Sequence, residues 1–330
     1  MKKNFLKPVF AIALICSVAY VSCKDKDEEP QPEPEVPTVA CSPATSFNAG
    51  TAIGPRLVFK FKFDSTQVRL DNFGNPATIP AGRAGQSPKF NFISQHYIEL
   101  ANDLDAVGGG KVLHIGTQTT AGGVSAIDYC ASTMTAENIT CFSKPLSQIT
   151  PGSYKWLRVS LAYQNYDIVY KANAIPGNHL GTGTIASFVG FNTYVNGYQI
   201  NGTSYLPSSA AGGPGNHLQG YWAFETNVLA TKYFYDGQAP AGATTVPNPF
   251  ISSPIPSGSC LVTGQFVDNA MVNAPLVITG AENQDIVITI SLSSNKSFEW
   301  TEVVADGFYQ PELGEAVLDM GLRGLIPIKN

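Results

Sequence analysis

The chain has 330 residues, of which 44% are hydrophobic and only 14% charged, and its net charge is −5. The hydrophobic fraction is ample for a core, and the charged fraction is low for a cytosolic surface. With 31 glycines and 23 prolines, the composition favours turns over helices. The acidic balance and the absence of a basic patch argue against nucleic acid as a partner.

The N-terminus has the pattern of an export signal. Met1–Asn4 is a short basic start, and Phe5–Val21 is a mostly apolar run that ends in small residues just before Cys23. The run is short for a membrane span, which needs roughly 20 apolar residues. We therefore expect residues 1–22 to be a signal peptide that is removed on export.

The residues around the cut carry a family resemblance. Val18–Cys23 resembles the lipobox of bacterial lipoproteins, in which the cysteine becomes the lipidated first residue of the mature protein. The charged, acid-rich run Lys24–Glu29 resembles the export signal of Bacteroidota-type surface lipoproteins. The resemblance implies a palmitate-type lipid anchor at Cys23 and a place in the outer membrane, facing the cell exterior. The alternative is that Lys24–Glu29 is only a solvated spacer.

A tether follows the anchor. Pro30–Pro37 alternates proline with mostly acidic residues, which favours an extended polyproline II spacer and excludes a core. No other stretch has the composition of an interdomain linker. We therefore expect residues 23–38 to be the lipidated cysteine with its tether, and residues 39–330 to fold as a single domain.

The folded part is expected to consist of strands. Leu57–Phe63 alternates, with Leu57, Phe59, Phe61 and Phe63 on one face. Phe90–Ile93 and Gln95–Leu100 are further strand candidates. The long run Tyr154–Tyr170 is rich in β-forming residues and puts Leu157, Val159, Leu161 and Tyr163 on one face. Ile286, Ile288, Ile290 and Leu292 repeat the alternation near the C-terminus.

Turn signals separate these strands, among them Gly108–Gly110, Pro151–Gly152 and Asp306–Gly307. The glycine- and asparagine-rich segment Asn201–Gln219 is expected to be a mobile loop. No long stretch has the apolar stripe of an amphipathic helix. The fold class is therefore predicted as all-β, an antiparallel β-sandwich with long loops.

The order of several segments resembles a known family. A first strand at Leu57–Phe63 precedes Ile93–Leu100, then Ile149–Tyr154 leads into a strand, and Gly220–Phe224 follows with a tryptophan. This order resembles the MbnP-like (methanobactin-partner) domains, a family of exported β-sandwich proteins. The resemblance implies a β-sandwich and an association with copper. The histidines His96, His114, His179 and His217 are scattered, which departs from a metal-binding pattern.

Four cysteines remain after export and lipidation: Cys41, Cys130, Cys141 and Cys260. In an exported chain they suggest two disulfides, with three possible pairings. Cys130 and Cys141 flank a short polar segment and could close a hairpin, which would leave Cys41 for Cys260. A metal site is the competing interpretation, although no Cys-x-x-Cys spacing supports it.

Catalytic motifs are missing from the sequence. It contains no Gly-x-Ser-x-Gly, His-Glu-x-x-His, P-loop or dinucleotide fingerprint. A glycoside hydrolase would need two carboxylates across a cleft, and Glu99, Asp128, Glu225 and Asp285 are candidates among which nothing selects a pair. We therefore expect a protein that is not an enzyme.

Glu302–Glu315 is the strongest candidate for a metal site. The segment resembles an acidic calcium loop, with Glu302, Asp306 and Glu315 at outer ligand positions and the carbonyl of Phe308 as one more ligand. Val304 stands where an oxygen ligand is expected, so the alternative is an ordinary surface turn. Calcium is the one cofactor that the sequence suggests.

Two weaker signals concern glycans. Aromatic residues crowd the middle of the chain, where exposed rings could stack on sugars or anchor protein partners, although most are expected to be core. Asp64–Thr66 resembles the O-glycosylation sequon of Bacteroidota-type exported proteins, with Ser65 as the modified residue.

The sequence as a whole predicts a non-catalytic cell-surface lipoprotein. It would act as a binding module or as an accessory subunit of an outer-membrane assembly, with other outer-membrane proteins as partners. The alternatives are a surface protein that binds a metal, either calcium or copper, and a glycan-binding protein or glycan hydrolase.

Overall fold

A computed structural model describes residues 42–71, 73–104, 107–173, 179–228, 230–239, 247–250 and 253–330. The predicted signal peptide, the lipidation site Cys23, the tether and Cys41 lie outside the described residues. The compact folded unit spans Thr38–Asn330.

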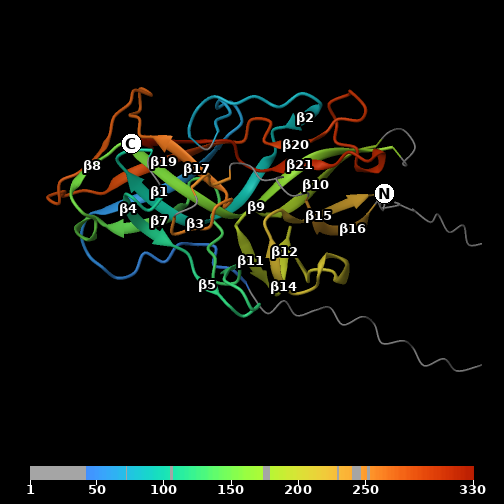
Figure 1. Ribbon diagram of the computed structural model, residues 1–330, viewed down its shortest axis with the longest axis horizontal. Helices are drawn as coiled ribbons and strands as arrows, with labels where there is room; N and C mark the ends of the chain where they lie inside the picture. Colours follow the sequence, from blue (N-terminus) through green and yellow to red (C-terminus); the bar gives the residue numbers. More distant parts are fainter. Residues whose placement is uncertain are drawn as a thin grey trace, which may run out of the picture. The chain divides into compact units, whose positions relative to one another are not determined.

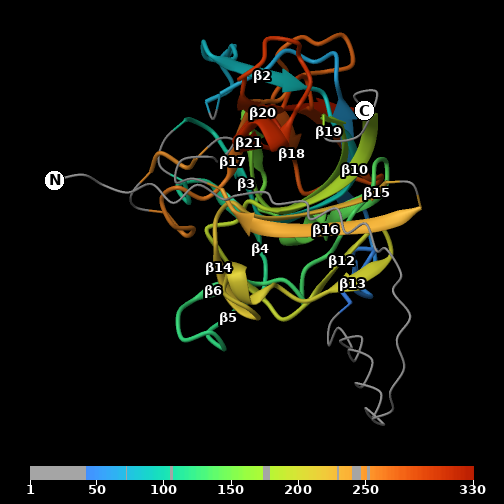
Figure 2. The same ribbon diagram turned by 90° about the vertical axis from the view of Figure 1, so that its right-hand side faces the viewer.

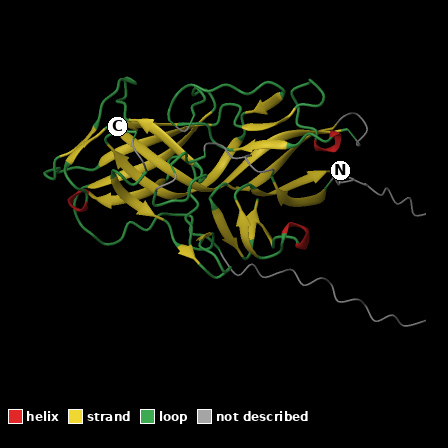
Figure 3. Ribbon diagram, viewed as in Figure 1, coloured by secondary structure: helices red, strands yellow, loops and turns green. Residues whose placement is uncertain are grey.

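The prediction of an all-β fold is confirmed for the described part of the chain (Figure 3). Its regular structure consists of strands and three short 3-10 turns, namely η1 (Leu146–Gln148), η2 (Ser209–Ala211) and η3 (Pro311–Leu313). Within these residues no helix is long and apolar enough to cross a membrane. The sheets are mostly antiparallel and pack face to face, as the predicted sandwich requires.

Three layers make up the folded unit, and the largest sheet forms the middle one (Figures 1 and 2). Its strand order is β16-β15-β10-β9-β3-β4, and β17 also pairs with β9. The strands of this central sheet are β3 (Lys89–Ala101), β4 (Lys111–Ile115), β9 (Trp156–Ala172), β10 (His179–Phe188), β15 (Tyr221–Val228), β16 (Thr231–Gln238) and β17 (Leu261–Gln265).

A four-stranded sheet of order β22-β19-β1-β7 packs on one face of the central sheet. Its strands are β1 (Arg56–Asp64), β7 (Thr140–Pro145), β19 (Ile286–Ser293) and β22 (Leu325–Lys329). The predicted alternation of β1 is confirmed, because Leu57, Phe59 and Phe61 are fully buried. Two pairs among the described strands depart from the antiparallel prediction: β1 and β19 run parallel, with Leu57 opposite Ile286, and so do β6 (Ala126–Asp128) and β11 (Asn192–Val195) of the third layer.

The third layer covers the other face of the central sheet. It consists of a sheet of order β14-β11-β6-β5 and a hairpin of β12 and β13 (Figure 1). The strands are β5 (Gln118–Thr119), β6 (Ala126–Asp128), β11 (Asn192–Val195), β12 (Tyr198–Ile200), β13 (Thr203–Tyr205) and β14 (Gly215–Leu218). The segment Asn201–Gln219, predicted to be a mobile loop, therefore contains two strands, and that expectation was wrong.

Two smaller sheets complete the fold. One pairs β8 (Gly152–Tyr154) with β18 (Leu276–Ile278), and the other joins β2 (Arg83–Gln86), β20 (Phe298–Thr301) and β21 (Val317–Met320). In Figure 2 the β2-β20-β21 sheet lies above the curved central sheet, and the β12-β13 hairpin lies below it.

The layers enclose two apolar cores, one on each face of the central sheet. The larger core contains Leu157, Val159 and Leu161 of β9 together with the buried residues of β1 and β19. The smaller core contains Tyr163 of β9 with Phe188 of β10 and with residues of the third layer. Because both faces of the central sheet are covered, its long strands are buried almost throughout.

Bulges in β3 and β9 decide which side chains enter which core. Ser94 pairs with Tyr163 and Gln95 pairs with Leu161, so Ala162 is an extra residue on β9. A bulge shifts the alternation of a strand by one residue. The prediction that Tyr163 shares a face with Leu161 was therefore wrong, since Tyr163 lies in the smaller core.

The cysteines differ from both predicted pairings. Cys141 and Cys260 are buried thiols rather than half-cystines, whereas Cys130 is disulfide-bonded. The pairings Cys130–Cys141 and Cys41–Cys260 were therefore wrong. Cys141 lies on β7, where its thiol donates to the carbonyl oxygen of Phe59 at 3.3 Å, and burial strongly raises its thiol pKa. Its place in the larger core explains why it is not paired with a cysteine in a surface loop.

Peptide mapping of protein isolated without reductant tests this assignment. Cys141 and Cys260 should react with an alkylating reagent only after denaturation, because both are buried. Cys130 should be found in a disulfide-linked peptide, and sequencing of that peptide would identify its partner. A Cys130–Cys141 peptide, or alkylation of Cys130 without prior reduction, would contradict the assignment.

The buried imidazole of His96 predicts a pH-dependent stability. Burial lowers the pKa of His96 to about 4, and the neighbouring His114 adds to the effect. In the unfolded chain the pKa is near 6.5. As the pH falls from 6.5 towards 4, the unfolded chain binds a proton that the folded chain does not. The free energy of unfolding should therefore decrease over this window, by about 3 kcal/mol in total from this group.

Urea unfolding at pH 7 and at pH 5 measures this effect. His96→Gln should reduce the loss of stability between the two pH values. Asn283→Gln, at an exposed position that carries no titratable group, is the control and should leave that loss unchanged. An equal loss of stability in wild type and in His96→Gln would show that His96 is not responsible.

Candidate functional site

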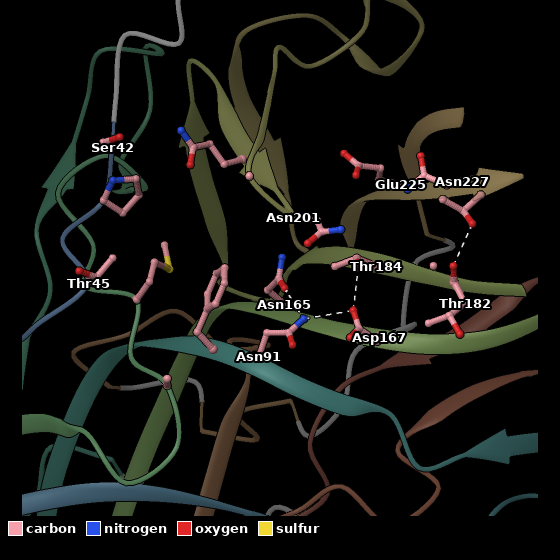
Figure 4. A pocket seen from close by; sticks show the side chains of 18 of the residues that line it. Ser42, Thr45, Asn91, Asn165, Asp167, Thr182, Thr184, Asn201, Glu225 and Asn227 are labelled. Carbon is pink, nitrogen blue, oxygen red and sulfur yellow. Dashed lines mark hydrogen bonds between the residues drawn. The ribbon is translucent and has the colours of Figure 1, made fainter. Parts of the chain in front are cut away.

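A cleft of about 670 Å³ opens on the face of the central sheet that the third layer covers. Residues of β3, β9, β10 and β15 form its floor, and the β12-β13 hairpin overhangs it (Figure 4). Its volume is in the range of small-molecule binding sites. The residues that line it include Ser42, Pro43, Thr45, Asn91, Phe92, Tyr129, Met134, Asn165, Asp167, Thr182, Thr184, Gln199, Asn201, Glu225, Thr226 and Asn227.

A row of polar residues crosses the floor of the cleft. Thr184 of β10 pairs directly with Asp167 of β9 on one side and with Glu225 of β15 on the other. Directly paired residues project from the same face of a sheet. With a strand spacing of roughly 4.8 Å, the backbones of Asp167 and Glu225 are about 10 Å apart. The sheet register thus places two carboxylates on one floor with a threonine between them.

A bulge in β3 turns Asn91 towards this row. Phe90 pairs with Tyr166 and Phe92 pairs with Asn165, so Asn91 is the extra residue. Its amide nitrogen donates to the Oδ1 atom of Asn165 at 2.9 Å and to the Oδ1 atom of Asp167 at 3.2 Å (Figure 4). Bulges commonly re-aim side chains next to binding sites.

The two oxygens of Asp167 are in different situations. Oδ1 accepts hydrogen bonds from the amide of Asn91 and, at 2.7 Å, from the hydroxyl of Thr184. Oδ2 has no hydrogen-bond partner within the part of the chain that the structure describes. A carboxylate oxygen has room for about two donors, so Oδ2 is an acceptor available to a ligand.

Glu225 is held more tightly than Asp167. The hydroxyl of Tyr205 donates to its Oε2 atom at 2.6 Å, and Lys232 Nζ lies 3.6 Å from Oε1. Burial, together with Glu225 itself, raises the pKa of Tyr205, which therefore stays a hydrogen-bond donor. The ring of Tyr205 also stacks on Phe234, with centroids 4.0 Å apart. These contacts fix the overhanging hairpin to the sheet.

The tip of the hairpin is an Asn201–Gly202 turn. Both residues have positive φ, 45° and 81°, as a type I′ turn requires. Asparagine and glycine adopt positive φ angles more readily than other residues, so the pair Asn201–Gly202 allows a tight turn between β12 and β13. The turn places Asn201 over the floor, opposite Thr184 (Figure 4).

One end of the cleft is aromatic. Phe92 and Tyr129 line it, and both rings rest on Tyr163, at centroid distances of 6.2 and 5.2 Å. Tyr129 also packs on Phe188 at 5.3 Å. Because these supporting rings belong to the smaller core, the aromatic end is rigid.

The N-terminal segment of the folded unit forms a further wall. Ser42, Pro43 and Thr45 line the cleft. Ala44 N donates to the carbonyl of Ser132 at 3.2 Å, and Met134 N donates to the carbonyl of Ala44 at 2.7 Å. These two bonds fix the segment that follows the tether beside the aromatic end.

The chemistry of the lining is neutral and polar. Asparagine, glutamine, threonine and serine side chains dominate, and the described lining contains no lysine, arginine or histidine. Asp167 and Glu225 are its charged groups. Amides and hydroxyls both donate and accept hydrogen bonds, and the half-buried ring of Phe92, supported by the buried ring of Tyr163, offers a face for stacking. Such a lining is suited to a ligand rich in hydroxyl groups.

The predicted calcium ligands are used within their own loop. Glu302 Oε1 accepts from the backbone N–H groups of Asp306 and Gly307 at 3.0 and 2.9 Å. Glu315 accepts from the N–H of Gln310 at 2.6 Å. Asp306 forms an ion pair with Lys171 at 2.6 Å, and the Phe308 N–H donates to it.

These carboxylates thus satisfy loop amides and a lysine. Across the described ranges, no group of three or more histidine, cysteine, aspartate or glutamate side chains is placed to hold a metal ion. The structure therefore does not bring Glu302, Asp306 and Glu315 together around an ion. Of the histidines, His96 on β3 and His114 on β4 are neighbours, whereas His179 lies on β10 and His217 on β14.

Only one of the carboxylates singled out from the sequence lies in the cleft, namely Glu225. Glu99 is buried beside Arg158 at 3.3 Å, Asp128 accepts from the N–H of Cys130, and Asp285 accepts from the N–H of Arg56. Asp167 was missed. Its alternation with Tyr166 and Ile168 could have indicated a polar face in the second half of β9.

Ser65 is exposed at the end of β1. Asp64 Oδ1 accepts from the N–H of Thr66 at 2.8 Å and from its hydroxyl at 2.6 Å. The turn presents the Ser65 side chain to solvent, so glycosylation there remains a prediction that the geometry allows.

Comparisons with known proteins leave the site to be interpreted from its geometry. No protein-family model, no curated protein and no solved structure matches the chain.

Proposed function

We propose that this protein is a cell-surface lipoprotein without catalytic activity, whose folded domain binds a glycan in the cleft. The observation that carries the glycan is the lining: a floor of amides and hydroxyls around Asp167, closed at one end by Phe92 and Tyr129. Sugars offer dense hydroxyl groups for such a floor and flat C–H faces for such rings.

The location rests on the N-terminal sequence. A basic start, an apolar run and Cys23 followed by an acidic stretch support a lipid anchor in the outer membrane with the domain outside. A surface protein held away from the membrane by a proline-rich spacer is well placed to capture a polymer too large to enter the cell. Other outer-membrane proteins remain proposed partners.

Binding is favoured over hydrolysis by the state of the two carboxylates. A glycoside hydrolase needs one protonated carboxyl group as the acid. Asp167 accepts from Thr184 and Asn91, and Glu225 accepts from Tyr205 beside Lys232. Both groups are thus surrounded by donors, which suit an acceptor-only carboxylate.

Asn165→Ala tests the binding site. The change removes a floor amide and leaves Asn91 without its closest partner, so affinity for the bound glycan should fall about fivefold or more. Full-length protein in detergent should be screened against immobilised polysaccharides and then measured by calorimetry. Asn283→Ala, at an exposed position outside the cleft, is the matched control. Equal affinity of Asn165→Ala and wild type would place the glycan elsewhere.

Cys23→Ser tests the anchor. The substitution removes the thiol that carries the lipid, so the protein should stay unprocessed or be released from the membrane. Fractionation of cells and immunoblotting measure both outcomes. Cys141→Ser is a control that keeps Cys23. A processed Cys23→Ser protein that still sediments with the outer membrane would refute the lipoprotein assignment.

A further inference from the structure

We propose that the carboxylate of Asp167 selects the charge class of the ligand, so that the cleft accepts uncharged glycan chains and rejects those carrying uronate or sulfate groups. This inference rests on the proposed function and makes its substrate class specific. It follows from a difference between the two carboxylates on the floor.

The charge of Glu225 is balanced within the protein. Lys232 Nζ lies 3.6 Å from one of its oxygens, and the hydroxyl of Tyr205 occupies the other. Glu225 is also only 3% exposed. Its charge therefore contributes little to the potential that a ligand meets in the cleft.

The charge of Asp167 is not balanced in this way. Its partners are the neutral groups of Asn91 and Thr184, both on Oδ1, and it forms no salt bridge within the described ranges. Asp167 is more exposed than Glu225 and lies in the middle strand of the floor, beside Asn165 and Thr184 (Figure 4). Its Oδ2 atom is the acceptor that a ligand would meet.

The side chains in the walls of the cleft do not compensate the negative charge of Asp167. The described lining of the cleft has no cationic side chain, so an anionic ligand would face Asp167 without a counter-charge. Concave sites lined by one sign of charge concentrate that potential and exclude ligands of the same sign. A hydroxyl group can donate to Oδ2, whereas a uronate or sulfate oxygen can only accept and is repelled.

Asp167→Asn separates the charge from the hydrogen bonds. The amide oxygen can still accept from Thr184 and Asn91, and the amide nitrogen takes the place of Oδ2. The variant should bind the preferred neutral glycan with a modest loss. It should bind acidic glycans about tenfold more tightly than wild type does, because the like-charge repulsion is gone.

The experiment uses full-length protein in detergent and an array of immobilised polysaccharides. The neutral probes are mannan, xylan and a β-glucan, and the acidic probes are polygalacturonate, alginate and chondroitin sulfate. Asp103→Asn removes the same charge from an exposed position outside the cleft and is the matched control. Glu225→Gln should gain less affinity for acidic probes than Asp167→Asn, because its charge is already balanced. Thermal unfolding confirms that each variant is folded.

The expected result is that wild type binds at least one neutral probe and no acidic one, while Asp167→Asn gains acidic probes and Asp103→Asn does not. Wild-type binding to acidic probes that Asn165→Ala weakens would overturn the inference and leave glycan binding in the cleft intact. An Asp167→Asn variant that gains no acidic probe would overturn it as well. Wild type that binds no probe of either class would contradict both this inference and the proposed function.

Discussion

The pairing of β3 with β9 is the constraint on which the rest of the structure depends. These two long strands lie at the centre of the middle sheet, and their register is interrupted at Asn91, His96 and Ala162. Each interruption shifts the alternation of side chains by one residue. The same strand β9 therefore supplies Leu161 to the larger core and Asp167 to the cleft on the opposite face.

The central sheet is covered on both faces, so its buried polar side chains depend on hydrogen-bond partners inside the protein. Buried polar groups in a sheet covered on two sides are usually hydrogen-bonded. On β9 the partners of Asn165 and Asp167 come from β3 and β10, whereas the side chains of Ser160 and Gln164 have no hydrogen-bond partner among the described residues. Where the third layer leaves a gap, Asn165 and Asp167 form part of the floor of the cleft, and their hydrogen bonds already fix their orientation. Asn91 donates to Asn165, and both Asn91 and Thr184 donate to Asp167, before any ligand arrives, so binding does not need to order these side chains.

Local patterns made the fold class and several strands predictable. Strict alternation in Leu57–Phe63 and around Ile288 has a period of two, which only a strand satisfies. The cleft could not be predicted, because it depends on bulges and on the register between distant strands. Nothing in the sequence near Asp167 indicates that Glu225, 58 positions later, shares its floor. At Glu302–Glu315 the local sequence suggested a site that the contacts do not form. Glu302 and Glu315 have the spacing of calcium ligands, but their oxygens accept hydrogen bonds from backbone amides of the loop.

The position of Ser42–Thr45 in the wall of the cleft has a mechanical consequence. A polymer held in the cleft would pull on the domain next to the point where the chain leaves for the tether. The load would then run from the cleft floor on the central sheet to Ser42–Thr45, whose backbone is bonded through Ala44 to Ser132 and Met134. In the proposed surface lipoprotein, tension between a bound polymer and the membrane would thus follow a short path between the cleft and its N-terminal wall, and the sheet of β1, β7, β19 and β22 would lie outside that path.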